Sequence, residues 1–218
     1  MKHIYSFFDN EQECVQSLLN IHNDGKSIEL DPMYNQGMFY KSIVEKPSLR
    51  YDLNAIEKGY DAEQGDATNL PLSDNSVHCM ILDPPFMFGT HGQTKKNVIN
   101  KRYTMFDSYN ELENCYKGIL KESYRVLDNK GILIFKCQDY TDSKTTMTHC
   151  LVWKWAIEQG FYPKDIAILN LPKPKIYNSN LQQKHLRKTH CYFWVFEKRK
   201  SKTQNHTTSE WLDELLGV

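Results

Sequence analysis

The sequence lacks the features that mark membrane-spanning proteins and proteins that bind polyanions through bulk charge. Its longest apolar runs, such as Val77–Leu82 and Cys191–Phe196, have only a few residues, whereas a membrane-spanning helix needs about twenty. Charge of one sign is not in excess either, because 27 Lys and Arg balance 27 Asp and Glu, for a net charge of zero. Any contact with nucleic acid must therefore be local.

The sequence also has no Cys-x-x-Cys pair, and its closely spaced histidines, His185 and His190, are too far from any cysteine pair to complete a zinc site. We therefore expect no metal site. Met1–Asn10 lacks the basic-then-apolar pattern of a signal peptide, so we expect a cytoplasmic protein. In that compartment we expect all six cysteines to be reduced, buried thiols: Cys14, Cys79, Cys115, Cys137, Cys150 and Cys191.

The residues that are present predict one globular α/β domain. The 218 residues include thirteen Tyr, ten Phe and four Trp, which is ample material for a core. Helical spacing of apolar residues predicts helices over 11–22, 108–127 and 146–159. Short apolar runs predict seven strands, at residues 27–30, 49–53, 62–66, 77–82, 132–137, 165–171 and 190–197.

This alternation predicts a doubly wound, mostly parallel sheet, with an antiparallel strand at one edge. We expect an N-terminal helix in residues 1–26, the main domain in 27–198, and a flexible basic tail in 199–218. A short helix is expected at Ser209–Leu216 within that tail. Ligands of such sheets bind at the carboxyl ends of the strands, where acidic residues stand here.

The sharpest motif is Asp83-Pro84-Pro85-Phe86, directly after the most apolar strand. Two prolines make a stiff, extended turn without N–H donors. The Asp83 carboxylate and the Pro84 carbonyl can accept both hydrogens of an exocyclic amine, and Phe86 can stack on its ring. The alternative is a rigid turn that only shapes a loop.

The motif resembles the (Asp/Asn/Ser)-Pro-Pro-(Tyr/Phe/Trp) signature of S-adenosylmethionine-dependent amino-methyltransferases, in particular a compact, often phage-borne group of DNA methylases. Those enzymes methylate adenine N6, cytosine N4, guanine N2 or a protein glutamine amide. The resemblance extends over residues 27–198, since Glu122–Leu127, Gly131–Cys137 and His190–Phe196 match later elements of the family. It implies a Rossmann-like class I methyltransferase fold.

The resemblance also implies cofactor-binding residues at three strand ends. Asp31, Pro32 and Gly37 stand where the family has its first cofactor motif, although the usual Gly-x-Gly turn is replaced by a loop with one glycine. Asp52 stands where an acidic residue holds the ribose hydroxyls, and Asp66-Ala67 where an Asp contacts the adenine. Taken alone, Asp31 could cap a turn, Asp52 could be a solvated carboxylate, and Asp66 could start the turn to Asn69.

Candidate substrate-binding residues lie in three places. Lys136 and Asp139 end the fifth strand and could face the substrate pocket; the alternatives are an internal ion pair or a solvated loop. Lys96 and Arg102 lie in the loop 87–104, which leaves the catalytic motif. His185 and Arg187 lie in a basic stretch before the last strand. Both basic segments could contact phosphate or simply be solvated.

We therefore expect a DNA methylase that acts on adenine N6 or, second, cytosine N4 of a flipped-out or unpaired base. RNA is the second substrate within this class. Sequence recognition is expected to be minimal or supplied by a partner, which includes a second copy of the chain. A catalytically silent methyltransferase-like module is the alternative outside the enzyme class. Methylation of a glutamine amide is disfavoured, because that branch usually has Asn in place of Asp83.

Overall fold

A computed structural model describes residues 3–89, 106–141, 144–171 and 184–199 of the chain. Lys96, Arg102 and the helix predicted at Ser209–Leu216 lie outside these residues, as does the predicted tail beyond residue 199. Among the described residues, no helix has the length and apolar character needed to cross a membrane.

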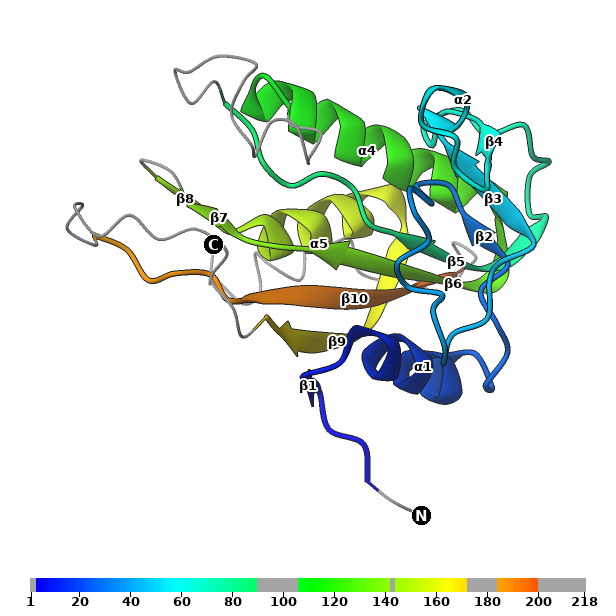
Figure 1. The fold of residues 1–218 in the computed structure, drawn as a ribbon, viewed down its shortest axis with the longest axis horizontal. Helices are drawn as coiled ribbons and strands as arrows, with labels where there is room; N and C mark the ends of the chain where they lie inside the picture. Colours follow the sequence, from blue (N-terminus) through cyan, green and yellow to red (C-terminus); the bar gives the residue numbers. More distant parts are fainter. Residues whose placement is uncertain (1–2, 90–105, 142–143, 172–183, 200–218) are drawn as a thin grey trace.

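Eight strands form one sheet in the order β1-β9-β10-β6-β5-β2-β3-β4 (Figure 1). Neighbouring strands from β4 to β6 are all parallel, and β10 runs antiparallel to both β6 and β9. The strands are β1 (Phe7–Phe8), β2 (Leu30–Asp31), β3 (Leu49–Asp52), β4 (Glu63–Gln64), β5 (Val77–Leu82), β6 (Leu127–Cys137), β9 (Phe161–Asn170) and β10 (His190–Lys198).

Two predictions about this sheet are corrected. The antiparallel strand β10 does not lie at the edge, because it pairs with β6 on one side and β9 on the other. The edge is β1, an eighth strand of two residues that pairs in parallel with Ile168 and Leu169. A strand so short has no period that could be detected in the sequence.

The helices cover both faces of the sheet (Figure 1). Helix α1 (Glu11–His22) lies on one face, and α4 (Tyr109–Val126) and α5 (Thr148–Gln159) lie on the other. A short helix, α2 (Ala55–Lys58), follows β3, and a separate hairpin of β7 (Tyr140–Thr141) and β8 (Thr145–Thr146) precedes α5.

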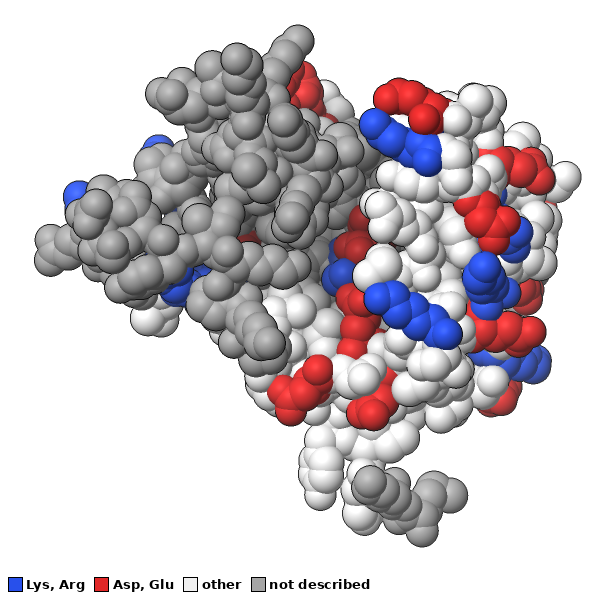
Figure 2. Space-filling view, viewed as in Figure 1, with Lys and Arg blue, Asp and Glu red and all other residues white. Residues whose placement is uncertain are grey.

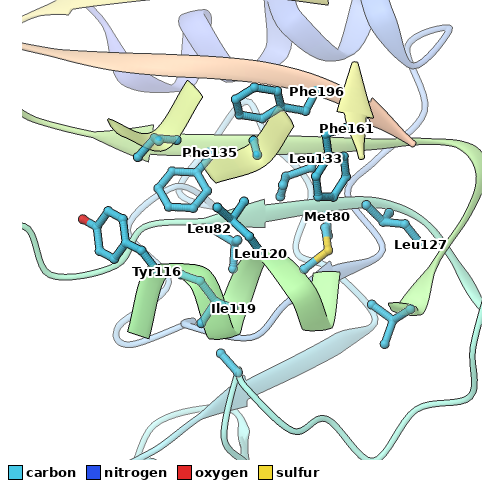
Figure 3. Packing of buried hydrophobic residues seen from close by; sticks show 14 of the residues in the cluster. Met80, Leu82, Tyr116, Ile119, Leu120, Leu127, Leu133, Phe135, Phe161 and Phe196 are labelled. Carbon is cyan, nitrogen blue, oxygen red and sulfur yellow. The ribbon is translucent and has the colours of Figure 1, made fainter. Parts of the chain in front are cut away.

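Alternating side chains of the central strands supply both halves of the core. Met80 and Leu82 of β5 pack with α4 and α5, whereas Cys79 and Ile81 pack with α1. Figure 3 shows the first half, in which Tyr116 of α4 meets Phe135 of β6. Because both faces are buried, β5 is apolar at nearly every position.

The cysteines are free thiols, as predicted, but they are not all buried. Cys115 is half-buried and Cys150 is exposed. Cys150 lies in the first turn of α5.

Candidate active site

Acidic side chains gather at the carboxyl edge of the parallel strands. Asp31 is the last residue of β2, Asp52 is the last of β3, and Asp83 directly follows β5. The negative charges of Asp83 and Asp52 both act on Asp31, so the three carboxyl groups are close in space. The sheet thus brings together three residues that the sequence separates by up to 52 positions.

The Asp83-Pro84-Pro85-Phe86 turn is held from two sides. The Tyr116 hydroxyl of α4 donates a hydrogen bond to the Pro85 carbonyl at 3.0 Å. Just beyond the turn, Phe106 N–H donates to the Met87 carbonyl at 3.0 Å. Pro84 is buried, whereas Phe86 is half-buried and so retains surface for stacking. The turn therefore presents its acceptors in a fixed geometry.

Asp83 stays accessible and keeps one carboxylate oxygen unpaired among the described residues. Its Oδ2 accepts a hydrogen bond from Lys136 Nζ at 2.8 Å, and 37% of its side chain stays accessible. Burial raises the pKa of Asp83, and the Lys136 ammonium offsets only part of that rise. Figure 2 shows acidic and basic atoms side by side in a hollow at the middle of this face.

Lys136 of β6 is the cation of this site. Its ammonium contacts Asp83 and also Glu11 Oε1, each at 2.8 Å. Burial opposes the charge on Lys136, but the two carboxylates outweigh it and raise its pKa. Lys136 thus forms an internal ion pair, and its contact with substrate stays a prediction.

Asp31 is buried at the start of the loop that replaces the Gly-x-Gly turn. Its Oδ1 accepts from Met33 N–H at 3.0 Å and its Oδ2 from the Tyr40 hydroxyl at 2.7 Å. Burial raises the pKa of Asp31 to about 7, against the lowering effect of those two hydrogen bonds. Asp31 is thus a carboxyl group that gains or loses its proton near neutral pH.

Aromatic packing shapes the same loop. Tyr34 and Tyr40 stack with ring centroids 5.5 Å apart. Gly37 has a φ of +63°, and a Cβ there would come within 2.5 Å of the Tyr34 hydroxyl oxygen. The single glycine of this loop is therefore required both by its backbone conformation and by close approach.

Asp52, at the end of β3, holds the loop that contains Asn35 and can still accept further hydrogen bonds. Its Oδ2 accepts from Asn35 N–H at 3.0 Å and its Oδ1 from Asn54 N–H at 2.8 Å. Each carboxylate oxygen has two lone pairs, so each can accept one more hydrogen bond. Asp52 can hold a vicinal diol such as that of a ribose.

Asp66 caps the turn that follows β4. Its Oδ1 accepts from both the N–H and the hydroxyl of Thr68, each at 2.8 Å. Ala67 is buried beneath this turn. Glu122 of α4 holds the next segment, since its Oε1 accepts a hydrogen bond from Leu70 N–H. The turn-starting role of Asp66 is observed, and its Oδ2 accepts no hydrogen bond from the described residues.

The remaining substrate candidates lie at the end of β6 and before β10. Asp139 is buried and accepts a hydrogen bond from His149 N–H, and its Oδ1 lies 2.7 Å from His149 Nδ1. His185 and Arg187 are exposed. Gln138 donates to the Lys188 carbonyl at 3.2 Å, which brings the stretch containing His185 and Arg187 beside the end of β6.

Four residues of this site were not predicted from the sequence. Tyr40, Tyr116 and His149 look like ordinary core or helix residues in the sequence. Glu11 lies in the first turn of α1, where acidic residues are common for reasons of the helix dipole. None carries a local signal for its partner, which lies 9 to 125 positions away.

A known protein family matches the central and C-terminal parts of the sequence. The model of a DNA methylase family matches residues 77–212. The chain belongs to the DNA methylase family. The matched region begins at the first residue of β5 and contains Asp83-Pro84-Pro85-Phe86, Lys136 and Asp139, whereas Asp31, Asp52 and Asp66 precede it.

The chain is also similar to solved structures, of which the first below supports its fold. A Burkholderia thailandensis 1,6-didemethyltoxoflavin-N1-methyltransferase with bound S-adenosylhomocysteine is 12% identical, with a TM-score of 0.51 over 88% of this chain and 80% of that one. A candidate DNA modification methylase from Thermus thermophilus, complexed with S-adenosylmethionine, is 14% identical, with a TM-score of 0.42 over 67% of this chain.

The chain spans 59% of the length of the Thermus protein. No curated protein matches the chain. The predicted Rossmann-like class I methyltransferase fold is confirmed, and the family match confirms a DNA methylase.

Proposed function

We propose that the chain transfers a methyl group from S-adenosylmethionine to an exocyclic amino nitrogen of a DNA base, with adenine N6 favoured over cytosine N4. The observation that carries this proposal is the Asp83 carboxylate, which directly follows β5 and has Oδ1 available while Lys136 holds Oδ2. The family match includes this residue.

The described residues fit the cofactor by charge and by hydrogen bonding. Asp31, Asp52 and Asp83 surround the carboxyl edge with negative charge, which favours a cationic ligand. Asp52 would hold the ribose hydroxyls, Asp31 would face the ammonium group, and Asp66 would contact the adenine. Pro32, Gly37 and Ala67 would line the same loops. When bound, S-adenosylmethionine supplies an electrophilic methyl group on a sulfonium.

Asp83 and the Pro84 carbonyl would activate the amine by accepting its two hydrogens. An aromatic amine shares its lone pair with the ring, and these two hydrogen bonds localise the pair on nitrogen. The nitrogen attacks the methyl carbon, the N–C bond forms as the C–S bond breaks, and that electron pair stays on sulfur. Asp83 then accepts the proton that nitrogen must lose.

Phe86 would stack on the base while these acceptors hold its amine. The amino group of a base inside a duplex is paired and cannot reach Asp83, so the base must be flipped out or unpaired. The exposed residues His185 and Arg187, together with Lys96 and Arg102, would provide the local contacts to nucleic acid that a net charge of zero requires.

The test supplies labelled S-adenosylmethionine together with DNA, RNA and protein, followed by digestion and identification of the product. We expect N6-methyladenine in DNA. Asp83→Ala should keep its affinity for S-adenosylhomocysteine by calorimetry and lose transfer by about a hundredfold or more. Asp61→Ala, which removes an exposed carboxylate before β4, is the control and should keep both.

Full transfer by Asp83→Ala would refute the mechanism. Methylated RNA or protein in place of methylated DNA would show that DNA is not the substrate. A silent module that binds nucleic acid or a partner is the second candidate, favoured by the Tyr34–Tyr40 stack in the first cofactor loop. A rise in melting temperature with S-adenosylmethionine would decide against it. A cytoplasmic location and a recognition partner, or a homodimer, remain predictions.

A further inference from the structure

The N-terminal helix reaches into the site through one residue, Glu11. Its carboxylate lies 2.8 Å from the Lys136 ammonium, which in turn lies 2.8 Å from Asp83. The family match starts at residue 77, so Glu11 lies 66 positions before it. One cation thus joins the first turn of α1 to the carboxylate proposed to hold the amine.

Local structure fixes the position of Glu11. Asn10 caps α1 by accepting hydrogen bonds from Gln12 and Glu13 N–H, so the helix begins at Glu11. The buried face of α1 packs on the sheet through Cys14, Val15, Leu18 and Leu19. The positive end of the helix dipole favours the ionised form of a carboxyl group in the first turn.

Aromatic rings enclose the Lys136 ammonium on its other sides. The Phe39 ring centroid lies 5.0 Å from Nζ, and that of Phe193 lies 5.9 Å from it. Only 19% of the Lys136 side chain is accessible. The ammonium is therefore confined between two carboxylates and two rings, and has little freedom to leave Asp83.

We propose that Glu11 and Lys136 are positioning residues for methyl transfer. Glu11 holds the Lys136 ammonium on Asp83 Oδ2, and this contact turns Oδ1 toward the amine and keeps Asp83 ionised. The inference rests on the proposed function, because it assigns Asp83 the role of amine acceptor.

Lys136 and Glu11 have opposite effects on the pKa of Asp83, so substituting them should move this pKa in opposite directions. Lys136 lowers the pKa of Asp83, whereas Glu11 raises it. Glu11→Gln keeps a hydrogen-bond acceptor for Lys136 but removes a negative charge, so the pKa of Asp83 should fall. Lys136→Met should raise it. The other titratable groups that face Asp83 stay the same in both variants: Asp31, Tyr116, Cys137 and Cys191.

The experiment measures kcat and KM for DNA against pH. We expect the acid limb of kcat/KM to move to lower pH in Glu11→Gln and to higher pH in Lys136→Met. Glu11→Ala, which releases the ammonium, should lower kcat about tenfold with little change in KM, and Glu11→Gln should restore most of it. Glu13→Gln, an exposed neighbour on the same helix, is the control and should match the unchanged protein.

A purely structural role would lower the amount of active protein without moving the two acid limbs in opposite directions. Carboxyl NMR titration of Asp83 in the same variants tests the electrostatic link without activity. If the pKa of Asp83 changes in opposite directions in the two variants but the unchanged protein transfers no methyl group, the proposed function alone is refuted. Normal transfer with identical acid limbs in all variants would overturn the inference alone. If Lys136→Met does not fold, the acid limb of Glu11→Gln still tests the inference.

Discussion

The buried carboxyl group of Asp31 should make the free energy of unfolding depend on pH, and Asp31→Asn should remove most of that dependence. The pKa of Asp31 rises from its ordinary value of 3.8 to about 7 in the folded protein. Between these two pH values the unfolded chain has lost the proton and the folded protein still binds it. The free energy of unfolding therefore falls as pH rises through this window, and it is highest below pH 4.

The magnitude follows from the size of that pKa change. Each pKa unit corresponds to about 1.4 kcal/mol, so ionising Asp31 costs the folded protein about 4 kcal/mol by pH 8. Asparagine has nearly the same shape. Its Oδ1 can still accept from Met33 N–H, and its Nδ2 can donate to the Tyr40 hydroxyl, which then acts as acceptor.

Urea unfolding at pH 4 and pH 8 measures the effect, without cofactor, in both proteins. We expect the stability of Asp31→Asn relative to the unchanged protein to increase by about 4 kcal/mol between these pH values. Taking the difference cancels every other titrating group. A difference that stays constant within about 1 kcal/mol would show that Asp31 is not a buried carboxyl group with a raised pKa.

Two further predictions concern the loops at the carboxyl edge. Asp66→Ala should weaken S-adenosylhomocysteine binding about tenfold by calorimetry; unchanged affinity would remove Asp66 from the cofactor site. Gly37→Ala should destabilise the protein in urea by about 1 to 3 kcal/mol, whereas Gly59→Ala, which shares a positive φ but has nothing within 4 Å of its Cβ, should cost less. Equal losses would contradict the predicted clash with Tyr34.

The elements that sequence predicted best are those with a strong period or cap. Helix α1 was predicted at Glu11–His22 and strand β5 at Val77–Leu82, and both bounds are observed. Asn10 supplies a cap for the first, and burial on both faces makes the second uniformly apolar. Such signals are local and need no knowledge of partners.

The missed features depend on pairing between distant strands. The strand predicted at 132–137 begins at Leu127 instead, because Leu127 already pairs with Val77 and a register shift follows between Val77 and Cys79. Strand β9 begins at Phe161 rather than Asp165, since β10 pairs with it up to Lys198. The ion pair of Lys136 with Glu11 joins residues 125 positions apart. No local pattern encodes such contacts.

The pairing of β1 with β9 gives the sheet a particular order of completion during synthesis. Phe7 is made 161 residues before its partner Ile168. Helix α1 likewise has its apolar face covered only after Ala167, Phe193 and Val195 have been made. Until then the nascent chain carries an uncovered apolar helix, and it would benefit from a holding chaperone.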